Sequence, residues 1–359
     1  MSEITTAQAN SPHANGEVTK SMAGVPAPGR AVPWTLIVFL IAALVPLLGS
    51  RYYTFVATDI IIFAMFATSL NLLLGVTGLV PFGHAAYFGV GAYVCAIMMK
   101  GDGLPDYLSW LAGTPFVLSW LIGGLAGALF AAFFGFFCVR LTSTYFSMLT
   151  MAFAQIIWAI CFKWNDVTGG EQGYTNVPVP STDWMSSIPW LGPLRYEHKF
   201  YFICLAMVAL SIAAMRRITQ SPFGRILTSI RDNPERAQFV GIDVRRYQLI
   251  VFTIAGGFAG LAGGLFAMLN RGVFPDFCYW PKSAEVLIMT ILGGIHHFWG
   301  PSVGAATLIL LNKFTVEYTE YWPLVLGVIL LVILFAFPGG ILGGIEALYR
   351  RVTGQRGRG

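Results

Sequence analysis

Three polar residues and a group of helix-breaking residues interrupt an apolar stretch between residues 69 and 93. The polar residues are Asn71, Thr77 and His84, and the residues that favour a break are Gly75, Gly78, Pro81 and Gly83. A broken helix exposes backbone N–H groups and the positive end of a half-helix, which can hold a carboxylate at membrane depth. The alternative is close helix packing by the glycines, with Asn71 and His84 hydrogen-bonded between helices.

A second group of glycines lies inside the long apolar run 285–312. Gly293 and Gly294 are followed by Gly300 and Pro301, so we expect this run to break there. We place a substrate path at the two breaks, lined by Asn71, Thr77, Gly78, Gly83, His84, Gly293 and Gly294. Between the second set of glycines, His296 and His297 are adjacent and point to different helix faces, without a zinc-type spacing, so we expect no metal site.

A glycine-rich segment between two apolar runs offers another anion site. Its residues are Thr168, Gly169, Gly170, Glu171, Gln172 and Gly173. Consecutive backbone N–H groups in such a loop can bind an anion. An ordinary turn that uses glycines for positive φ explains the composition equally well. Glu171 at the tip could pair with a basic group of a partner.

The polar segment from Ser221 to Gln248 predicts two short helices joined by a turn. Asn233 is expected to cap the second helix, Pro234 to begin it, and Gly241 to end it. In the first helix, Phe223, Ile226, Leu227 and Ile230 form an apolar face opposite an arginine face. Such a hairpin can lie on a membrane surface or dock into a groove of a soluble partner. A basic interfacial loop without a partner is the alternative.

The absence of several motifs excludes other classes of function. No lysine follows a glycine, so the chain lacks the phosphate-binding loop of ATPases and we expect no cofactor on it. No Ser/His/Asp arrangement indicates an enzyme. Within the apolar runs the carboxylates are Asp59 and Glu285, both near the ends of runs, which lowers the weight of a proton- or sodium-coupled carrier.

Composition predicts an all-α, polytopic membrane protein. The 359 residues are 56% hydrophobic and 11% charged, with a mean hydropathy of +0.68, and that charge content is too low for a water-soluble core. Apolar runs lie at about 34–49, 55–75, 84–99, 116–138, 144–162, 200–215, 249–269, 285–312 and 323–337. The five cysteines form no C-x-x-C pair and are interpreted as small buried hydrophobic residues.

The arginines predict the orientation of these runs. Half of the 22 Lys and Arg residues lie between 216 and 246 or between 350 and 358, so both regions are expected in the cytoplasm, and nucleic-acid binding is not indicated. Breaking the run 285–312 gives about 8 to 10 transmembrane helices, with one or two broken or re-entrant segments. We expect a disordered cytoplasmic tail at 1–32, a transmembrane domain at 33–345 with a cytoplasmic loop at 216–248 and an external loop at 163–199, and a basic cytoplasmic tail at 346–359.

Several motifs together resemble one family, the LivM-like permeases of bacterial ABC importers for branched-chain amino acids. The polar segment is similar to their cytoplasmic coupling loop at Gly224, Arg225, Ile230, Arg231, Asn233, Ala237, Gly241, Ile242, Val244 and Tyr247. The stretch from Asn71 to Tyr93 is similar to their hallmark segment, with Pro81 where serine is more usual. Thr168–Gly173, Leu292–Pro301 and Phe337–Gly343 follow in the family's order, although the last lacks the usual arginine.

The resemblance implies a non-enzymatic subunit in the bacterial inner membrane, with both termini in the cytoplasm. It implies two ATPase subunits, a second homologous permease and a periplasmic substrate-binding protein as partners. Its coupling residues would be Gly224, Arg225, Ile226, Leu227, Ile230, Arg231, Asn233, Ala237, Phe239 and Gly241. We expect Ile226, Leu227, Ile230 and Phe239 to fill a groove of the ATPase. The alternatives are a urea or short-chain amide permease of the same type, and a passive small-solute channel.

Overall fold

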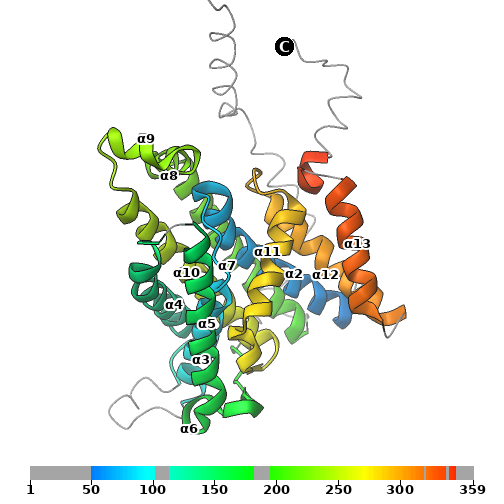
Figure 1. Cartoon of the computed structure of the whole chain (residues 1–359). Helices are drawn as coiled ribbons and strands as arrows, with labels where there is room; N and C mark the ends of the chain where they lie inside the picture. The colour runs from blue at the N-terminus through cyan, green and yellow to red at the C-terminus, as the bar shows by residue number, and fades with distance from the viewer. Residues whose placement is uncertain are drawn as a thin grey trace, which may run out of the picture. The chain divides into compact units, whose positions relative to one another are not determined.

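The computed structural model describes residues 50–101, 113–141, 143–181, 195–318, 321–336 and 339–344, which form a bundle of helices (Figure 1). The α-helices are α2 (Arg51–Asn71), α3 (His84–Lys100), α4 (Phe116–Cys138), α5 (Ser143–Lys163), α6 (Asn165–Thr168), α7 (Tyr196–Gln220), α8 (Pro222–Asp232), α9 (Pro234–Phe239), α10 (Val244–Leu269), α11 (Trp280–Gly293), α12 (Gly300–Tyr318) and α13 (Trp322–Ala336). A π-helix, η2 (Leu72–Thr77), continues α2, and two short 3-10 helices are η4 (Gly170–Gln172) and η6 (Pro275–Cys278). The expected tails and the run 34–49 lie outside these residues.

The predicted all-α, polytopic fold is confirmed. Within the described ranges, five helical segments are long and apolar enough to cross a membrane: Arg51–Thr77, Phe116–Cys138, Thr144–Lys163, Tyr196–Gln220 and Val244–Leu269. The run 285–312 breaks as expected, between α11 and α12. Helices α11 and α13 are shorter than the roughly 20 residues of a straight span, so the choice between eight and ten crossings stays a prediction.

Close packing of small residues holds the centre of the bundle together. A Cβ atom on Gly91 of α3 would overlap the backbone of Gly260 in α10, and one on Gly127 of α4 would lie 2.7 Å from the carbonyl oxygen of Gly256. Glycine at these positions lets α3, α4 and α10 approach to backbone contact, as is common for helices in lipid. Apolar side chains fill the space beside them.

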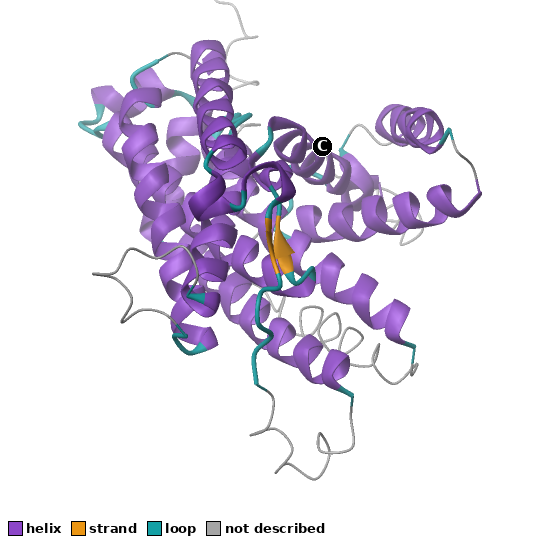
Figure 2. Cartoon of the chain, turned by 90° about the horizontal axis from the view of Figure 1, so that it is seen from below, coloured by secondary structure: helices purple, strands orange, loops and turns teal. Residues whose placement is uncertain are grey.

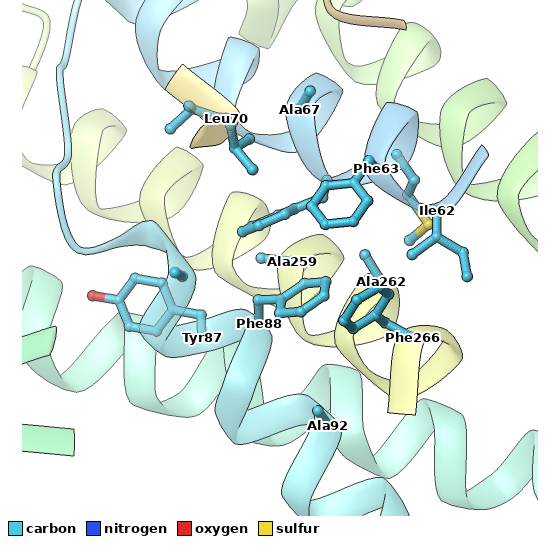
Figure 3. Packing of buried hydrophobic residues seen from close by; sticks show 14 of the residues in the cluster. Ile62, Phe63, Ala67, Leu70, Tyr87, Phe88, Ala92, Ala259, Ala262 and Phe266 are labelled. Atoms are coloured by element: carbon cyan, nitrogen blue, oxygen red, sulfur yellow. The ribbon is translucent and has the colours of Figure 1, made fainter. Parts of the chain in front are cut away.

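The aromatic part of the core joins three helices. Figure 3 shows Phe63 of α2, Phe88 of α3 and Phe266 of α10 turned toward one another. The ring centroids of Phe63 and Phe266 are 5.3 Å apart, with the edge of one ring against the face of the other. The outer face of α4 carries exposed apolar side chains at four-residue spacing, at Leu121, Leu125, Leu129 and Phe133. That stripe is what a helix facing lipid requires.

Two short strands form the one sheet in the part of the chain described here. Strand β1 (Tyr174–Thr175) pairs antiparallel with β2 (Gly272–Val273), placing Tyr174 opposite Val273 (Figure 2). This pair joins the segment after α6 to the segment after α10. Helices α8 and α9 lie at the opposite end of the bundle from α6 (Figure 1). The glycine-rich segment Thr168–Gly173 and the polar segment Ser221–Gln248 are therefore separated by the length of the transmembrane helices.

Candidate functional site

The first predicted break is present at the end of α2. The helix widens into the π-helix η2, and Gly78 ends it with φ of +78°, a conformation that glycine adopts without strain. Thr77 donates its hydroxyl to the Leu72 carbonyl at 2.9 Å, so this polar side chain closes the widened turn. Asn71 is 4% exposed, and its Oδ1 atom accepts no hydrogen bond from the described residues.

The second predicted break lies against the first. Helix α11 ends at Gly293, Gly294 takes φ of +112°, and α12 begins at Gly300. A Cβ atom on Gly75 would overlap both the Asn71 side-chain oxygen and the Ile295 carbonyl oxygen. The structure thus brings the two glycine-rich segments, more than 200 residues apart in sequence, into contact. Whether Asn71, Gly293 and their neighbours line a substrate path stays a prediction.

His84 serves helix packing in this conformation. Its side chain is fully buried, its Nε2 atom is 2.9 Å from the Ser69 hydroxyl, and its ring stacks on Phe66 with centroids 5.4 Å apart. Gly83 packs against the backbone carbonyl of Thr150 in α5. For these two residues, the interpretation as contacts between helices agrees better with the structure than exposure to an open path.

The predicted hairpin forms with the predicted cap at Asn233, and Ser221 and Asp243 cap the helices on either side. Ser221 accepts a hydrogen bond from the Gly224 N–H at 3.4 Å, Asn233 from the Arg236 N–H at 2.8 Å, and Asp243 from the Arg246 N–H at 3.2 Å. Gly241 has φ of +91°, as expected for the end of α9. Helices α7 and α10 continue directly into and out of the hairpin, so a force on α8 and α9 acts on two long helices.

An arginine of the hairpin binds the first helix break. The Nη1 atom of Arg231, in α8, donates a hydrogen bond of 2.6 Å to the carbonyl oxygen of Gly75 in η2. The carbonyl groups at a helix C-terminus carry partial negative charge, which a guanidinium stabilises. A Cβ atom on Gly78 would lie 2.9 Å from Cγ of Arg231, so glycine at that position makes room for the arginine. Arg231 therefore caps the broken helix.

The apolar face of α8 is directed into the chain itself. Leu227 is 1% exposed and Ile230 is 2% exposed, and Ile230 packs with Ala237 and Val244. The expectation that these two side chains enter a partner's groove is therefore wrong for this conformation, because intramolecular contacts already bury them. Phe239 and Val240 at the tip are 90% and 78% exposed and are the apolar groups accessible to a partner.

The glycine-rich segment after α5 forms a turn rather than an open anion site. Gly169 N–H donates to the Asn165 carbonyl, Gly173 N–H to the Gly170 carbonyl, and Gly170 N–H to the Thr168 hydroxyl. Because these three glycine donors are used within the turn, the alternative of an ordinary turn agrees with the structure. A Cβ atom on Gly173 would meet the Val273 carbonyl, so the turn packs against the backbone of β2. Glu171 is exposed at its tip.

Sequence reasoning missed a small cavity at the far end of the bundle from α8 and α9. The cavity has a volume of about 170 Å³ and lies between the first turns of α2 and α7 and the end of α10. Its polar lining includes Tyr196, Glu197 and Arg271, which the sequence spreads over 75 positions without a recognisable motif. The feature of the sequence that could have indicated this cavity is Arg271, a charged residue shortly after the apolar helix 244–269.

The arrangement defines a multi-pass helical membrane protein with adjoining helix breaks and a capped hairpin beside one of them. The chain belongs to the family described as "Branched-chain amino acid transport system / permease component", whose model matches residues 52–334. It is thus a permease-family protein of transport systems, rather than a member of an enzyme family.

Curated relatives agree with this assignment. The chain is 28% identical to the high-affinity branched-chain amino acid transport system permease protein LivM of Escherichia coli, over 85% of this chain and 74% of the relative. It is 26% identical to LivH of the same organism, over 79% and 92%, and 23% identical to a probable LivH of Methanocaldococcus jannaschii, over 78% and 88%. No solved structure matches the chain.

Proposed function

We propose that this chain is a permease subunit of a bacterial ABC importer that moves branched-chain or related amino acids across the inner membrane. The chain has no phosphate-binding loop, so ATP would be hydrolysed on partner subunits. The observation that carries the proposal is the hydrogen bond from Arg231 to the Gly75 carbonyl. It joins a hairpin that is exposed to partners with a helix break inside the bundle.

The mechanism we propose is alternating access driven through the hairpin. Closure of two ATPase subunits would push on the exposed Phe239 and Val240 and move α8 and α9 as a lever. Arg231 would transmit that movement to η2, and the contact between Gly75 and Ile295 would pass it to the second break. Two adjoining breaks can then rearrange together relative to α3, α4 and α10, whose backbone contacts keep these three helices packed as one unit.

The positions of the helices and the names of the relatives support the proposed orientation in the membrane and the proposed partner subunits. Helices α8 and α9 carry three arginines, and the adjoining turns of α7 and α10 carry four more. The hairpin lies opposite α6 along the bundle, in keeping with a cytoplasmic hairpin and an external turn (Figure 1). A second homologous permease would complete the path, since the two relatives LivM and LivH are both named as permease proteins of such systems. A periplasmic binding protein would deliver the substrate at the end near α6.

The test is uptake into vesicles that contain the chain with two candidate ATPase subunits, a second permease and a binding protein. We expect uptake of radiolabelled leucine that requires both ATP and the binding protein. Uptake of urea under the same requirement would favour the urea permease, and uptake of either solute without ATP would contradict the importer and favour a channel.

A further inference from the structure

We propose that the cavity at the starts of α2 and α7 is a subsite for a zwitterionic α-amino acid, with Arg271 binding the carboxylate and Glu197 the ammonium group. This inference rests on the proposed function, which it makes more specific. The volume of about 170 Å³ lies below the roughly 300–1,000 Å³ that drug-sized ligands occupy, so the cavity suits a ligand of about one amino acid.

Arg271 is held in an uncommon backbone conformation that presents its side chain to the cavity. Its φ is +52°, which L-residues other than asparagine and aspartate rarely adopt. The backbone is fixed on both sides, because the Arg271 N–H donates to the Met268 carbonyl at 3.2 Å and its carbonyl accepts from the Val177 N–H at 3.2 Å. Strain kept in place by surrounding contacts is more common at functional sites.

The cationic group of Arg271 has no counter-ion within the described residues. None of their side chains forms a hydrogen bond or ion pair with its guanidinium. The hydroxyl of Tyr196, which also lines the cavity, is buried and has no hydrogen-bond partner among those residues. A carboxylate would satisfy both groups, because guanidinium binds carboxylate with two parallel hydrogen bonds and the phenol can donate a third.

The negative side of the cavity is Glu197, in the first turn of α7. Its carboxylate lies 3.6 Å from Nε of Arg51, whose side chain is 67% exposed, so this ion pair is loose and screened by water. Glu197 can therefore exchange Arg51 for an ammonium group at little cost. Arg271 and Glu197 thus provide opposite charges at one small cavity, which matches the opposite charges of an amino acid.

The remaining wall is mostly apolar and suits an aliphatic side chain, and the hydroxyls of its two threonines, Thr54 and Thr58, donate to backbone carbonyls at the start of α2. Phe200 and Met268 are 5% and 2% exposed, and Phe55 and Leu269 complete this part of the lining. A neutral polar solute such as urea would leave Arg271 without a charged partner and could not replace Arg51 at Glu197. Sites with charged groups reject ligands that cannot pair with them, so the cavity should discriminate strongly in favour of zwitterions.

The position of the cavity suits an entry site. Helix α7 runs 25 residues from the cavity to the hairpin, a length of about 37 Å, and α10 runs back over a similar distance. The cavity therefore lies on the side to which a periplasmic binding protein would deliver substrate in the proposed orientation. The turn at Thr168–Gly173 leads into β1, and β1 pairs with β2 immediately after Arg271. The turn therefore helps to hold the backbone on one side of the cavity.

The experiment introduces Phe55→Cys into the reconstituted transporter and measures its rate of modification by an externally added maleimide. The described native cysteines are all buried, so the new thiol should react first. We expect L-leucine to slow the modification at least fivefold and urea to leave it unchanged. Leucinamide, without a carboxylate, and 4-methylpentanoate, without an ammonium group, should protect only at roughly tenfold to hundredfold higher concentration, the range for one lost charged hydrogen bond.

Variants assign the two charges. Arg271→Asn removes the guanidinium and retains a residue that tolerates positive φ, and Glu197→Gln removes the carboxylate with little change in shape. Each should raise the leucine concentration needed for protection by roughly tenfold or more. The control Arg195→Gln removes an exposed arginine that does not line the cavity and should leave protection unchanged.

The outcomes separate this subsite from the proposed function. The modification experiment needs no ATP, so a failure of ATP-driven uptake with normal leucine protection would contradict the importer alone. ATP-driven leucine uptake without protection at Phe55→Cys would overturn the subsite alone. Equal protection by urea and leucine, or unchanged protection in both Arg271→Asn and Glu197→Gln, would also overturn it.

Discussion

The guanidinium of Arg231 donates a hydrogen bond of 2.6 Å to the carbonyl oxygen of Gly75, and so ties the hairpin α8–α9 to the broken end of α2. The carbonyl of Ile295, in the break between α11 and α12, also lies against Gly75, where a Cβ atom would overlap it. One glycine therefore contacts both a hairpin arginine and the second helix break. In the proposed importer, this is the place where movement of the hairpin reaches the interior of the bundle.

The packing at Gly75 predicts the effect of adding a methyl group there. Gly75→Ala would force the new Cβ atom against the Asn71 oxygen and the Ile295 carbonyl, at a cost of about 1–3 kcal/mol for overpacking. We expect a lower melting temperature of the purified protein and reduced leucine uptake. The matched control is Gly327→Ala in α13, where a Cβ atom meets nothing within 4 Å and a small stabilisation is expected. Equal melting temperatures for the two variants would contradict the close contact of the breaks.

The burial of Ile230 predicts that a charge at this position damages the hairpin itself. Ile230→Asp would place a carboxylate among Ala237 and Val244 and should cost about 3 kcal/mol or more locally. We expect faster proteolysis within 221–248 and loss of substrate-stimulated ATP hydrolysis, while membrane insertion is retained. Thr228→Asp, on the partly exposed side of α8, should be cut at the wild-type rate. If Ile230→Asp were cut at the wild-type rate, the intramolecular packing of α8 would be contradicted.

The exposed tip of the hairpin predicts a separate loss of partner binding. Phe239→Asp changes a side chain that is 90% exposed, so the fold should keep its melting temperature. We expect weaker co-purification of the ATPase subunits by roughly tenfold or more, because an apolar anchor residue at an interface typically contributes about 2 kcal/mol. Gln238→Ala, an exposed polar neighbour, should co-purify normally. Undiminished ATPase binding by Phe239→Asp would place the docking surface elsewhere.

Local features of this fold could be predicted from the sequence, because they depend on neighbouring residues. The cap at Asn233, the stop at Gly241 and the break after Gly293 all follow from short-range preferences for backbone conformation. Most helices could be located from the apolar runs for the same reason. The length of an apolar run does not determine how many times it crosses the membrane, so the number of crossings stays a prediction.

Relationships across the chain could not be predicted, because one sequence contains no information on which segments meet. Arg231 and Gly75 are 156 positions apart, and Gly75 and Ile295 are farther still. The spacing of apolar residues predicts the apolar face of α8, but it does not show whether that face packs on another subunit or on the same chain. For this reason the sequence does not reveal that Leu227 and Ile230 are buried within the chain. The φ of Arg271 depends on its contacts with Met268 and Val177 and left no local signal.

The most direct test of the proposed coupling is the amount of leucine imported per ATP hydrolysed by the reconstituted transporter. Arg231→Met removes the hydrogen bond to Gly75 and keeps the length of the side chain, while Arg217→Met removes an exposed arginine of α7 and serves as the control. We predict that Arg231→Met still hydrolyses ATP but imports at least tenfold less leucine per ATP, with the control near wild type. Equal ratios for Arg231→Met and the wild type would contradict the role of this contact.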